Sequence, residues 1–436
     1  MTALTLTAAN PQLRALELIA ERAAGWIPVI VMAYPLIVWP MAFGVAESAR
    51  GLMDTPTQVQ ETNIFNRLFF PLAFLMASAA ALTVPLTRLR PLLSAPLILL
   101  GLYLAWAALS VGWALDPGIA LRRLIAQGCL VGALVLSLLA VKDVDRVIRR
   151  LFWLIVVAAL LNLAVVAVSP PGPLGHEGIY TQKNTLGAAA ALTMILALYA
   201  MFSNRQSLWL TGVPLLLIAL VLMVLSQSKT SLGVAVLAPA LAFGLVLASR
   251  VLRVSAAISL TLGIGFIVLV YYLGKASHLW DFPTVAGALF GDPTLTSRTD
   301  IWGFATEMIA RRPIFGYGFE SFWGIGHEGP AHREAPGFVS QMPHAHNGYI
   351  DVWLQTGIVG LVLVAAFLAT AVHAAARSTL PPRLAWLFLT LIVYMIGQNF
   401  LESTWFATLS FSWIGLVVAV TLAARWHRGA AESDAG

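Results

Sequence analysis

The sequence predicts an all-α, polytopic membrane protein with about 12 transmembrane helices and a large, partly helical loop on the outer side. Of its 436 residues, 59% are hydrophobic and 11% are charged, and the mean hydropathy is +0.84. Soluble domains carry about 25% charged residues, so this composition indicates membrane spans. The spans must be helices, because hydrocarbon offers no partner for unpaired backbone groups.

Apolar runs of about 17–25 residues mark the individual spans. They cover residues 25–45, 68–87, 93–113, 119–141, 150–168, 184–202, 207–225, 230–248, 254–273, 345–373, 384–403 and 405–424. The expected domain organisation follows from these runs. Residues 1–273 hold spans one to nine after a cytoplasmic N-terminus, residues 274–343 form the outer loop, and residues 344–436 hold the last three spans and a cytoplasmic tail.

The distribution of Lys and Arg predicts the orientation. Of the 26 basic residues, fifteen fall in the segments assigned to the inside, six in short outer connections and five in the long outer loop. Because cytoplasmic connections are enriched in Lys and Arg, both termini are expected inside. The net charge of +6 is therefore largely explained by topology, and nucleic acid is not an expected partner.

The outer loop of about 70 residues is too long for a plain connection, and it is expected to hold a helix. Thr299 or Asp300 is a suitable N-cap, and Ile301, Phe304 and Met308 recur at helical spacing. Arg311, Arg312 and Pro313 are expected to end this helix. The pattern predicts an amphipathic helix on the outer face of the membrane.

Several outer cations have no role in orientation. The six in short connections are Arg50, Arg67, Arg122, Arg123, Lys183 and Lys229. Together with Arg298 of the loop, the last four should lie at one membrane depth, where a lipid-linked diphosphate is the available large anion. Phospholipid headgroups, or Asp116, Glu177 and Asp300, are the alternative partners. Lys183 and Lys229 are each expected to open a helix, whose free N–H groups would also face phosphate oxygens.

Two histidines, His344 and His346, stand where the outer loop meets the tenth span. If Pro343 lies in the first turn of a helix, the positive end of the helix dipole favours the neutral imidazole, which can accept a proton from a hydroxyl. The alternative for His346 is a hydrogen bond to a loop carbonyl, and His344 is expected to support it. Gln398 and Glu402, four residues apart, are candidate ligands of an acceptor sugar or helix contacts.

Other chemistries find less support. Residues two apart in a helix do not share a face, so His344 and His346 do not predict a metal site, and Cys129 lies within a span. The sequence has no Gly-x-Ser-x-Gly nucleophile elbow. It also lacks a Gly-rich phosphate loop. The loops show no clustered carboxylates that would hold a cation under a nucleotide diphosphate.

Five motifs carry a resemblance to a known family. They are Gln182-Lys183-Asn184-Thr185-Leu186-Gly187, Ser226-Gln227-Ser228-Lys229-Thr230-Ser231, Ser297-Arg298-Thr299-Asp300-Ile301-Trp302, Arg312-Pro313-Ile314-Phe315-Gly316-Tyr317-Gly318, and His344-Ala345-His346-Asn347-Gly348-Tyr349-Ile350-Asp351 with Gln355-Thr356-Gly357-Ile358-Val359-Gly360 after it. In this order they resemble the bacterial O-antigen polymerase and O-antigen ligase superfamily, particularly its exopolysaccharide-polymerase branch. The resemblance covers residues 175–360 and reaches the first 170 mainly through topology.

The resemblance implies a GT-C-like, metal-independent and cofactor-free glycosyltransferase of the bacterial inner membrane, with its active site facing the periplasm. Such enzymes move a glycan from undecaprenyl diphosphate to an acceptor hydroxyl. The family's catalytic histidine corresponds to His346, and its paired diphosphate-binding cations correspond to Lys229 and Arg298. Many relatives have Arg where this chain has Lys229, which keeps the charge but cannot grip a phosphate in bidentate fashion. Asn184, Asp300 and Asn347 are expected to support the site.

The polymerase interpretation takes a lipid-linked repeat unit as acceptor, and the ligase interpretation takes the lipid A core. Partners of either enzyme would include the lipid-linked glycan, the acceptor glycolipid, membrane lipids, and chain-length regulators and export proteins. A lipid-oligosaccharide flippase or exporter is the alternative of another class. A flippase would carry its charges through mid-membrane, whereas here they gather at the outer rim.

Overall fold

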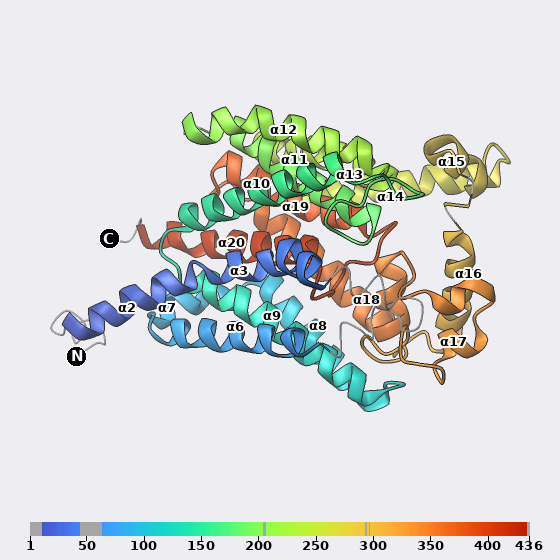
Figure 1. Cartoon of the computed structure of the whole chain (residues 1–436), viewed down its shortest axis with the longest axis horizontal. Helices are drawn as coiled ribbons and strands as arrows, with labels where there is room; N and C mark the ends of the chain where they lie inside the picture. Colours follow the sequence, from blue (N-terminus) through green and yellow to red (C-terminus); the bar gives the residue numbers. More distant parts are fainter. Residues whose placement is uncertain (1–10, 44–62, 204–205, 293, 296, 434–436) are drawn as a thin grey trace. The chain divides into compact units, whose positions relative to one another are not determined.

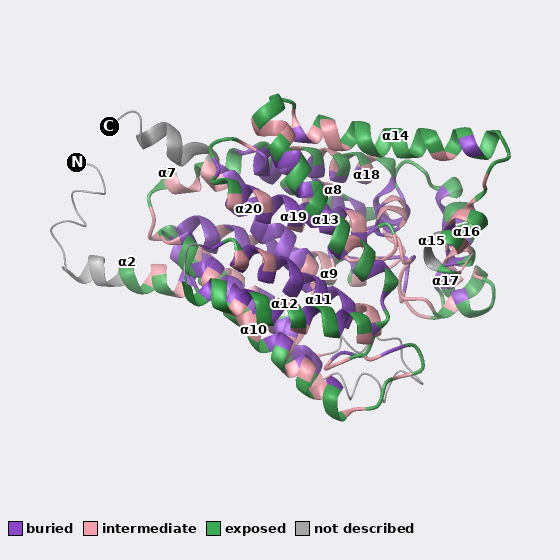
Figure 2. Cartoon of the chain, turned by 90° about the horizontal axis from the view of Figure 1, so that it is seen from above, coloured by how far each residue is buried: buried purple, intermediate pink, exposed green. Residues whose placement is uncertain are grey.

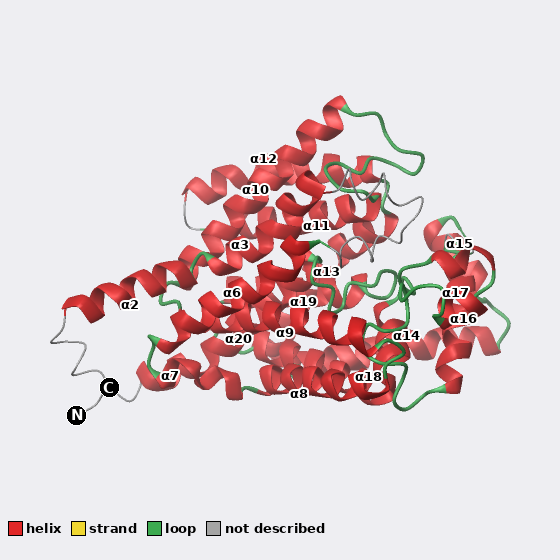
Figure 3. Cartoon of the chain, turned by 60° about the horizontal axis from the view of Figure 1, so that its bottom comes forward, coloured by secondary structure: helices red, strands yellow, loops and turns green. Residues whose placement is uncertain are grey.

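The computed structural model describes residues 11–43, 63–203, 206–292, 294–295 and 297–433, and in these ranges it forms helices and loops without a strand (Figures 1 and 3). The all-α prediction is therefore confirmed. Arg50, one of the outer cations, lies outside the described residues, and so does the end of the first predicted span.

Ten described helical segments are long and apolar enough to cross a membrane. They are Glu17–Phe43, built from α2 (Pro11–Ala24), α3 (Ile27–Ala33) and the π-helical η1 (Tyr34–Val38); α6 (Ile64–Leu82); α8 (Ala95–Ser110) with η3 (Val111–Trp113); α9 (Pro117–Ala140); α10 (Val144–Val168); α11 (Lys183–Met201); α12 (Gln206–Ser226); α13 (Lys229–Leu247) with η4 (Ala248–Leu252); α14 (Ala256–Ala276); and α18 (Gly348–Ala375). Short α7 (Leu86–Leu89) and η2 (Arg90–Leu93) precede α8.

Two shorter apolar helices follow α18, where the last two spans were predicted. They are α19 (Pro382–Gln398) and the apolar part, Phe411–Trp426, of α20 (Phe411–Ser433). The prediction of continuous spans over 384–403 and 405–424 was wrong at their shared end, because residues 399–410 form a loop. This loop carries Glu402.

The chain divides into two compact units. Unit one comprises residues 1–98, 125–231 and 406–436, and unit two comprises residues 99–124 and 232–405. In unit one, α11 is the most enclosed candidate span, with 78% of its apolar window buried. In unit two, α14 has 6% of its window buried, and its exposed apolar surface suits contact with lipid (Figure 2).

The segment between α14 and α18 contains four short helical elements. These are α15 (Phe282–Phe290), α16 (Arg298–Arg311), α17 (Pro330–Glu334) and the 3-10 helix η5 (Gly337–Gln341). The predicted loop helix is confirmed as α16, but its N-cap is Ser297, at a left-handed φ of 62°, instead of Thr299 or Asp300. Asp300 lies exposed in the first turn, where its charge suits the helix dipole.

The apolar face of α16 is buried against protein. Ile301, Phe304 and Met308 pack with Phe322 and Trp323 of the following loop in one hydrophobic cluster. The cluster also includes Ala345 and Leu354 at the start of α18. A separate salt-bridge pair at the far end of α16 joins Arg311 to Glu307 and Glu334. The loop helix is thus part of a folded layer between the candidate spans α14 and α18, and this layer continues into α18.

The loop after α16 fits into a break in α18. Gly357 adopts φ 69° inside this helix, so the single span predicted over 345–373 is interrupted there. The amides of Tyr317 and Gly318 donate to the carbonyls of Leu354 (3.0 Å) and Gln355 (2.8 Å), and the amide of Ile358 donates to Pro313 (2.9 Å). A Cβ atom at Gly357 would collide with the backbone of Ile314. The motif over residues 312–318 therefore packs into the motif over residues 355–360, and Gly357 is required at their contact.

Candidate active site

His344 and His346 lie in the turn before α18, not in its first turn. The helix begins at Gly348, and the side chain of Asn347 caps it by accepting from the amides of Tyr349 (3.0 Å) and Ile350 (3.2 Å). The prediction that Pro343 opens the helix was therefore wrong, because Asn347 provides the stronger cap. With the helix-dipole argument removed, a neutral His346 stays a prediction.

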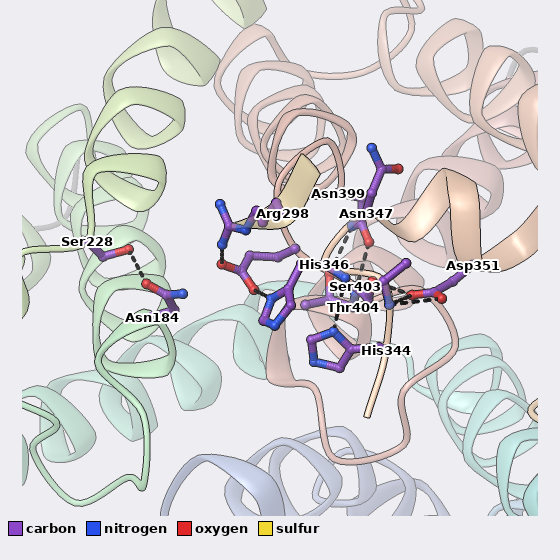
Figure 4. A network of polar contacts seen from close by, with 12 residues as sticks. Asn184, Ser228, Arg298, His344, His346, Asn347, Asp351, Asn399, Ser403 and Thr404 are labelled. Carbon is purple, nitrogen blue, oxygen red and sulfur yellow. Dashed lines mark hydrogen bonds and ion pairs between the residues drawn. The ribbon is translucent and has the colours of Figure 1, made fainter. Parts of the chain in front are cut away.

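An unbroken chain of charge contacts runs from Arg298 through Glu402 to His346 (Figure 4). Nη2 of Arg298 lies 2.7 Å from Oε1 of Glu402, and Oε2 of the same carboxylate lies 3.4 Å from Nδ1 of His346. The Arg298 and Glu402 side chains are each 12% exposed and the His346 side chain is 22% exposed. Partial burial strengthens such contacts, because water screens them less. The structure brings together two of the predicted site residues through a third.

Glu402 was predicted to be either a ligand of the acceptor sugar or a helix contact, on one helix face with Gln398. In the structure Gln398 is the last residue of α19 and is 3% exposed, which leaves its amide little access to a sugar. Glu402 lies beyond the helix, in the loop before α20. Its carboxylate has both oxygens engaged, so its geometry suits positioning and charge balance better than sugar binding.

His344 is in direct contact with His346, and its supporting role stays a prediction. The two rings pack edge to face with centroids 4.3 Å apart, and the backbone amide of His346 donates to Nδ1 of His344 (3.2 Å). Burial, the His346 ring and the Arg298 guanidinium together lower the pKa of His344 well below its usual value. A neutral His344 keeps the lone pair that accepts this hydrogen bond. The premise that the two rings lie on different helix faces was wrong, since neither residue is helical.

Asp351, the last residue of the His344–Asp351 motif, holds the turn in place. Its buried carboxylate accepts from the indole N–H of Trp323 (2.8 Å), the backbone amide of Ala345 (3.1 Å) and the hydroxyl of Ser403. One side chain thereby joins three segments: the loop after α16, the histidine turn and the loop after α19. An acidic residue in the first turn of an apolar span was the sequence signal for this role.

A second polar centre joins the beginning of α18 to the end of α19. The side chain of Asn399 accepts from the amides of Thr404 (2.9 Å) and Trp405 (3.2 Å), and its carbonyl accepts from the amide of Gly348 (2.9 Å). The amide side chain of Asn347 donates to the carbonyl of Phe400 (3.1 Å). These bonds fix the loop that carries Glu402 beside the turn that carries His346.

Gly348 should tolerate no side chain, because a Cβ atom there would collide with Asn399 and Trp405. We expect Gly348→Ala to lower the free energy of unfolding by about 1–3 kcal/mol through overpacking. Gly303→Ala in α16 is the matched control, since a Cβ atom there meets nothing within 4 Å. It should be neutral or stabilising by about 0.5–1 kcal/mol. Thermal unfolding of the purified variants measures both, and equal stabilities would contradict the close approach at Gly348.

Lys183, Asn184 and Lys229 belong to unit one. Lys183 opens α11 and Lys229 opens α13, as predicted. Asn184 Oδ1 accepts from the hydroxyl of Ser228 (3.1 Å), so the starts of these two helices lie together. Gly187 permits the approach, because its Cβ would lie 2.6 Å from that of Ser228. Since Arg298 and His346 belong to unit two, convergence of the two groups on one ligand stays a prediction.

Arg122 and Arg123 differ in environment within unit two. Arg122 is exposed near the start of α9. The Arg123 side chain is 12% exposed, lies 4.0 Å from the carboxylate of Glu320 and donates to the carbonyl of the same residue. Its guanidinium therefore binds the loop after α16. This role accounts for its charge, whereas Arg122 is better placed to meet a ligand.

Comparisons with known proteins agree with these motifs. Residues 189–365 match the family model described as O-Antigen ligase. The exopolysaccharide production protein ExoQ of Rhizobium meliloti (strain 1021) is 27% identical over 287 residues, which is 61% of this chain and 62% of that protein. The match thus spans less than two thirds of the relative. The residues that match the family model include α16, the histidine turn and the break in α18.

Proposed function

We propose that this chain, which resembles the O-antigen ligase and polymerase superfamily, is a periplasmic-facing glycosyltransferase that polymerises undecaprenyl-diphosphate-linked repeat units. The observation that carries this proposal is the contact chain Arg298–Glu402–His346. It combines a candidate base, a carboxylate that orients it and a cation, in and beside the segment matched by the family. The location of the enzyme in the bacterial inner membrane and its GT-C-like organisation are parts of the same proposal.

His346 acts as the general base in the proposed reaction. Glu402 accepts the hydrogen bond from Nδ1–H, so the lone pair of Nε2 is left to accept the proton. The acceptor hydroxyl loses this proton to Nε2 as its oxygen forms a bond with the anomeric carbon. The bond from that carbon to the diphosphate oxygen breaks at the same time. A single displacement of this kind inverts the anomeric configuration.

The diphosphate leaves with negative charge, which cations stabilise in place of a metal ion. Arg298 is the cation that Glu402 joins to the base. The helix starts at Lys183 and Lys229 would add two further ammonium groups beside backbone N–H donors. Arg122 is the fourth candidate. Asp351, Asn347 and Asn399 position the reacting turn and do not touch substrate in this scheme.

The ligase reaction is the second candidate, and the description of the family model as O-Antigen ligase favours it. The acceptor would then be the lipid A core instead of a lipid-linked repeat unit. The resemblance to an exopolysaccharide production protein favours the polymerase. Deleting the gene distinguishes the two, because a lost polymerase leaves short lipid-linked units, whereas a lost ligase leaves long polymer that is not attached.

Purified protein reconstituted with lipid-linked repeat units in the outer leaflet tests the enzymatic proposal. We expect longer lipid-linked glycan and one released undecaprenyl diphosphate for each bond formed, with no loss of rate when a chelator is added. A chain-length regulator or an export protein should alter product length but not the existence of the reaction. Movement of intact lipid-linked units without new glycosidic bonds would refute the proposal and favour a flippase.

A further inference from the structure

A basic cavity of about 310 Å³ lies in unit one, between the end of α2 and the beginning of α10. Its charged lining consists of Arg22, Lys142, Arg146, Arg150, Glu21 and Asp143. Four cations thus face two carboxylates. In the predicted orientation this end of unit one is cytoplasmic, and α10 separates it from the loop that leads to Lys183. The reaction proposed above makes no use of this site.

Two of the four cations are balanced within the lining. Lys142 lies 3.4 Å from the carboxylate of Glu21, and Arg146 lies 3.2 Å from that of Asp143. Arg22 and Arg150 have no carboxylate at ion-pair distance among the described residues. The cavity therefore holds an excess of two positive charges, which an anion would neutralise.

Arg150 is held in position without an anion. Its guanidinium lies 4.1 Å from the centre of the Trp26 ring. Gly25 leaves room for it, because a Cβ atom at Gly25 would lie 2.9 Å from Nη1 of Arg150. A cation that is stacked on an aromatic ring keeps its N–H donors available at the ring edge. The guanidinium is thus preorganised, with its hydrogen-bonding edge unused by a carboxylate.

Other cations at this end of unit one already have structural roles. Arg88 donates to the carbonyl of Ala140 (3.3 Å) and Arg425 to the carbonyl of Leu138 (2.8 Å), so both neutralise the C-terminal end of α9. General enrichment in cytoplasmic Lys and Arg explains such residues. This enrichment does not explain a cavity in which two cations have no carboxylate to balance their charge.

Apolar groups border the cavity. Leu18, which lines it, is 54% exposed, and the neighbouring Ile19 and Trp26 are 63% and 47% exposed. Trp and aliphatic side chains beside a basic pocket are typical of the interface where acyl chains meet headgroups. We propose that the cavity binds the phosphodiester headgroup of an anionic phospholipid of the inner leaflet, with its acyl chains along Leu18 and Trp26.

Lipid retention by the full-length protein tests this proposal. The protein is placed in nanodiscs of phosphatidylcholine with or without phosphatidylglycerol, and lipid binding is measured by native mass spectrometry. Wild type should retain phosphatidylglycerol in preference to phosphatidylcholine. Each basic residue near an anionic surface changes the affinity for anionic lipid by about five-fold. The affinity of the Arg22→Gln/Arg150→Gln double variant for phosphatidylglycerol should therefore be about 30-fold lower than that of wild type. Gly25→Ala should also weaken binding, by displacing Arg150 with no change in charge.

The control is Arg149→Gln, which removes one positive charge from the residue adjacent to Arg150 but outside the cavity lining. It should retain phosphatidylglycerol as wild type does. Unfolding temperatures in pure phosphatidylcholine confirm that all variants are folded. A loss of about five-fold in Arg149→Gln would overturn the proposal, because one charge would then count equally inside and outside the cavity. Stabilisation by inorganic phosphate in phosphatidylcholine equal to that by phosphatidylglycerol would overturn the assignment to a lipid.

Discussion

Replacing His346 by alanine should abolish almost all glycan transfer while the protein stays folded. A positioned general base contributes about 10²–10⁴-fold to rate, so the turnover number of His346→Ala should fall by that factor. The side chain is 22% exposed and contacts the Glu402 carboxylate and the His344 ring, so its loss opens no core cavity. Product formation by purified protein in liposomes gives the rate, and thermal unfolding shows that the variant is folded.

His332→Ala is the control for this experiment. His332 lies in α17 of the same extramembrane segment, exposed, with its Nε2 atom 2.9 Å from Nδ1 of His327. Its replacement removes one imidazole from the segment but leaves the contact chain intact, so the rate should stay within about two-fold of wild type. If His346→Ala makes polymer as fast as wild type, the assignment of the base is wrong, whatever the control shows.

Glu402→Gln should lower the turnover number by about 10²-fold and leave KM almost unchanged. The amide keeps the shape of the carboxylate but cannot balance the Arg298 guanidinium 2.7 Å away, nor stabilise the imidazolium that forms on His346. A residue that only bound the acceptor sugar would instead raise KM at constant turnover number. Initial rates over a range of acceptor concentrations separate these two outcomes.

Glu334→Gln is the comparable change at a carboxylate outside the site. Glu334 lies 2.5 Å from Arg311 and its side chain is 43% exposed, so it also loses an ion pair with arginine. Because exposed ion pairs contribute about 0–1 kcal/mol, neither stability nor rate should change much. If the Glu402→Gln enzyme instead has a raised KM and the turnover number of wild type, Glu402 binds the acceptor sugar and does not position the base.

The helices could be predicted from the sequence because hydrocarbon imposes strict demands on length and composition. The starts at Lys183 and Lys229 were predicted to within one residue, since a polar motif meets an apolar run at each. The break at Gly357 and the loop over 399–410 were missed. Both depend on backbone contacts with distant segments, such as Pro313 to Ile358, which hydropathy does not register.

Two residues of the candidate site could be singled out from the sequence, but the contact that connects them could not. His346 and Arg298 were both singled out, but 48 positions of sequence separate them, and the carboxylate that joins them comes from a third segment. Glu402 was noticed only for its spacing from Gln398. Asp351 was recognised only as part of a motif, and the sequence did not show that it accepts hydrogen bonds from three different segments. Long-range pairing of this kind leaves no periodic trace in a sequence.

The interlock at Gly357 has a consequence for biosynthesis. Residues 313–318 leave the ribosome before the helix they grip, so the receiving surface can already be in place when the Gly348–Ala375 stretch reaches the bilayer. The outer layer then acts as a template for the span, instead of being added to a finished bundle. Damage outside the membrane, in the Pro313–Gly318 stretch, would accordingly show itself as a misplaced transmembrane segment.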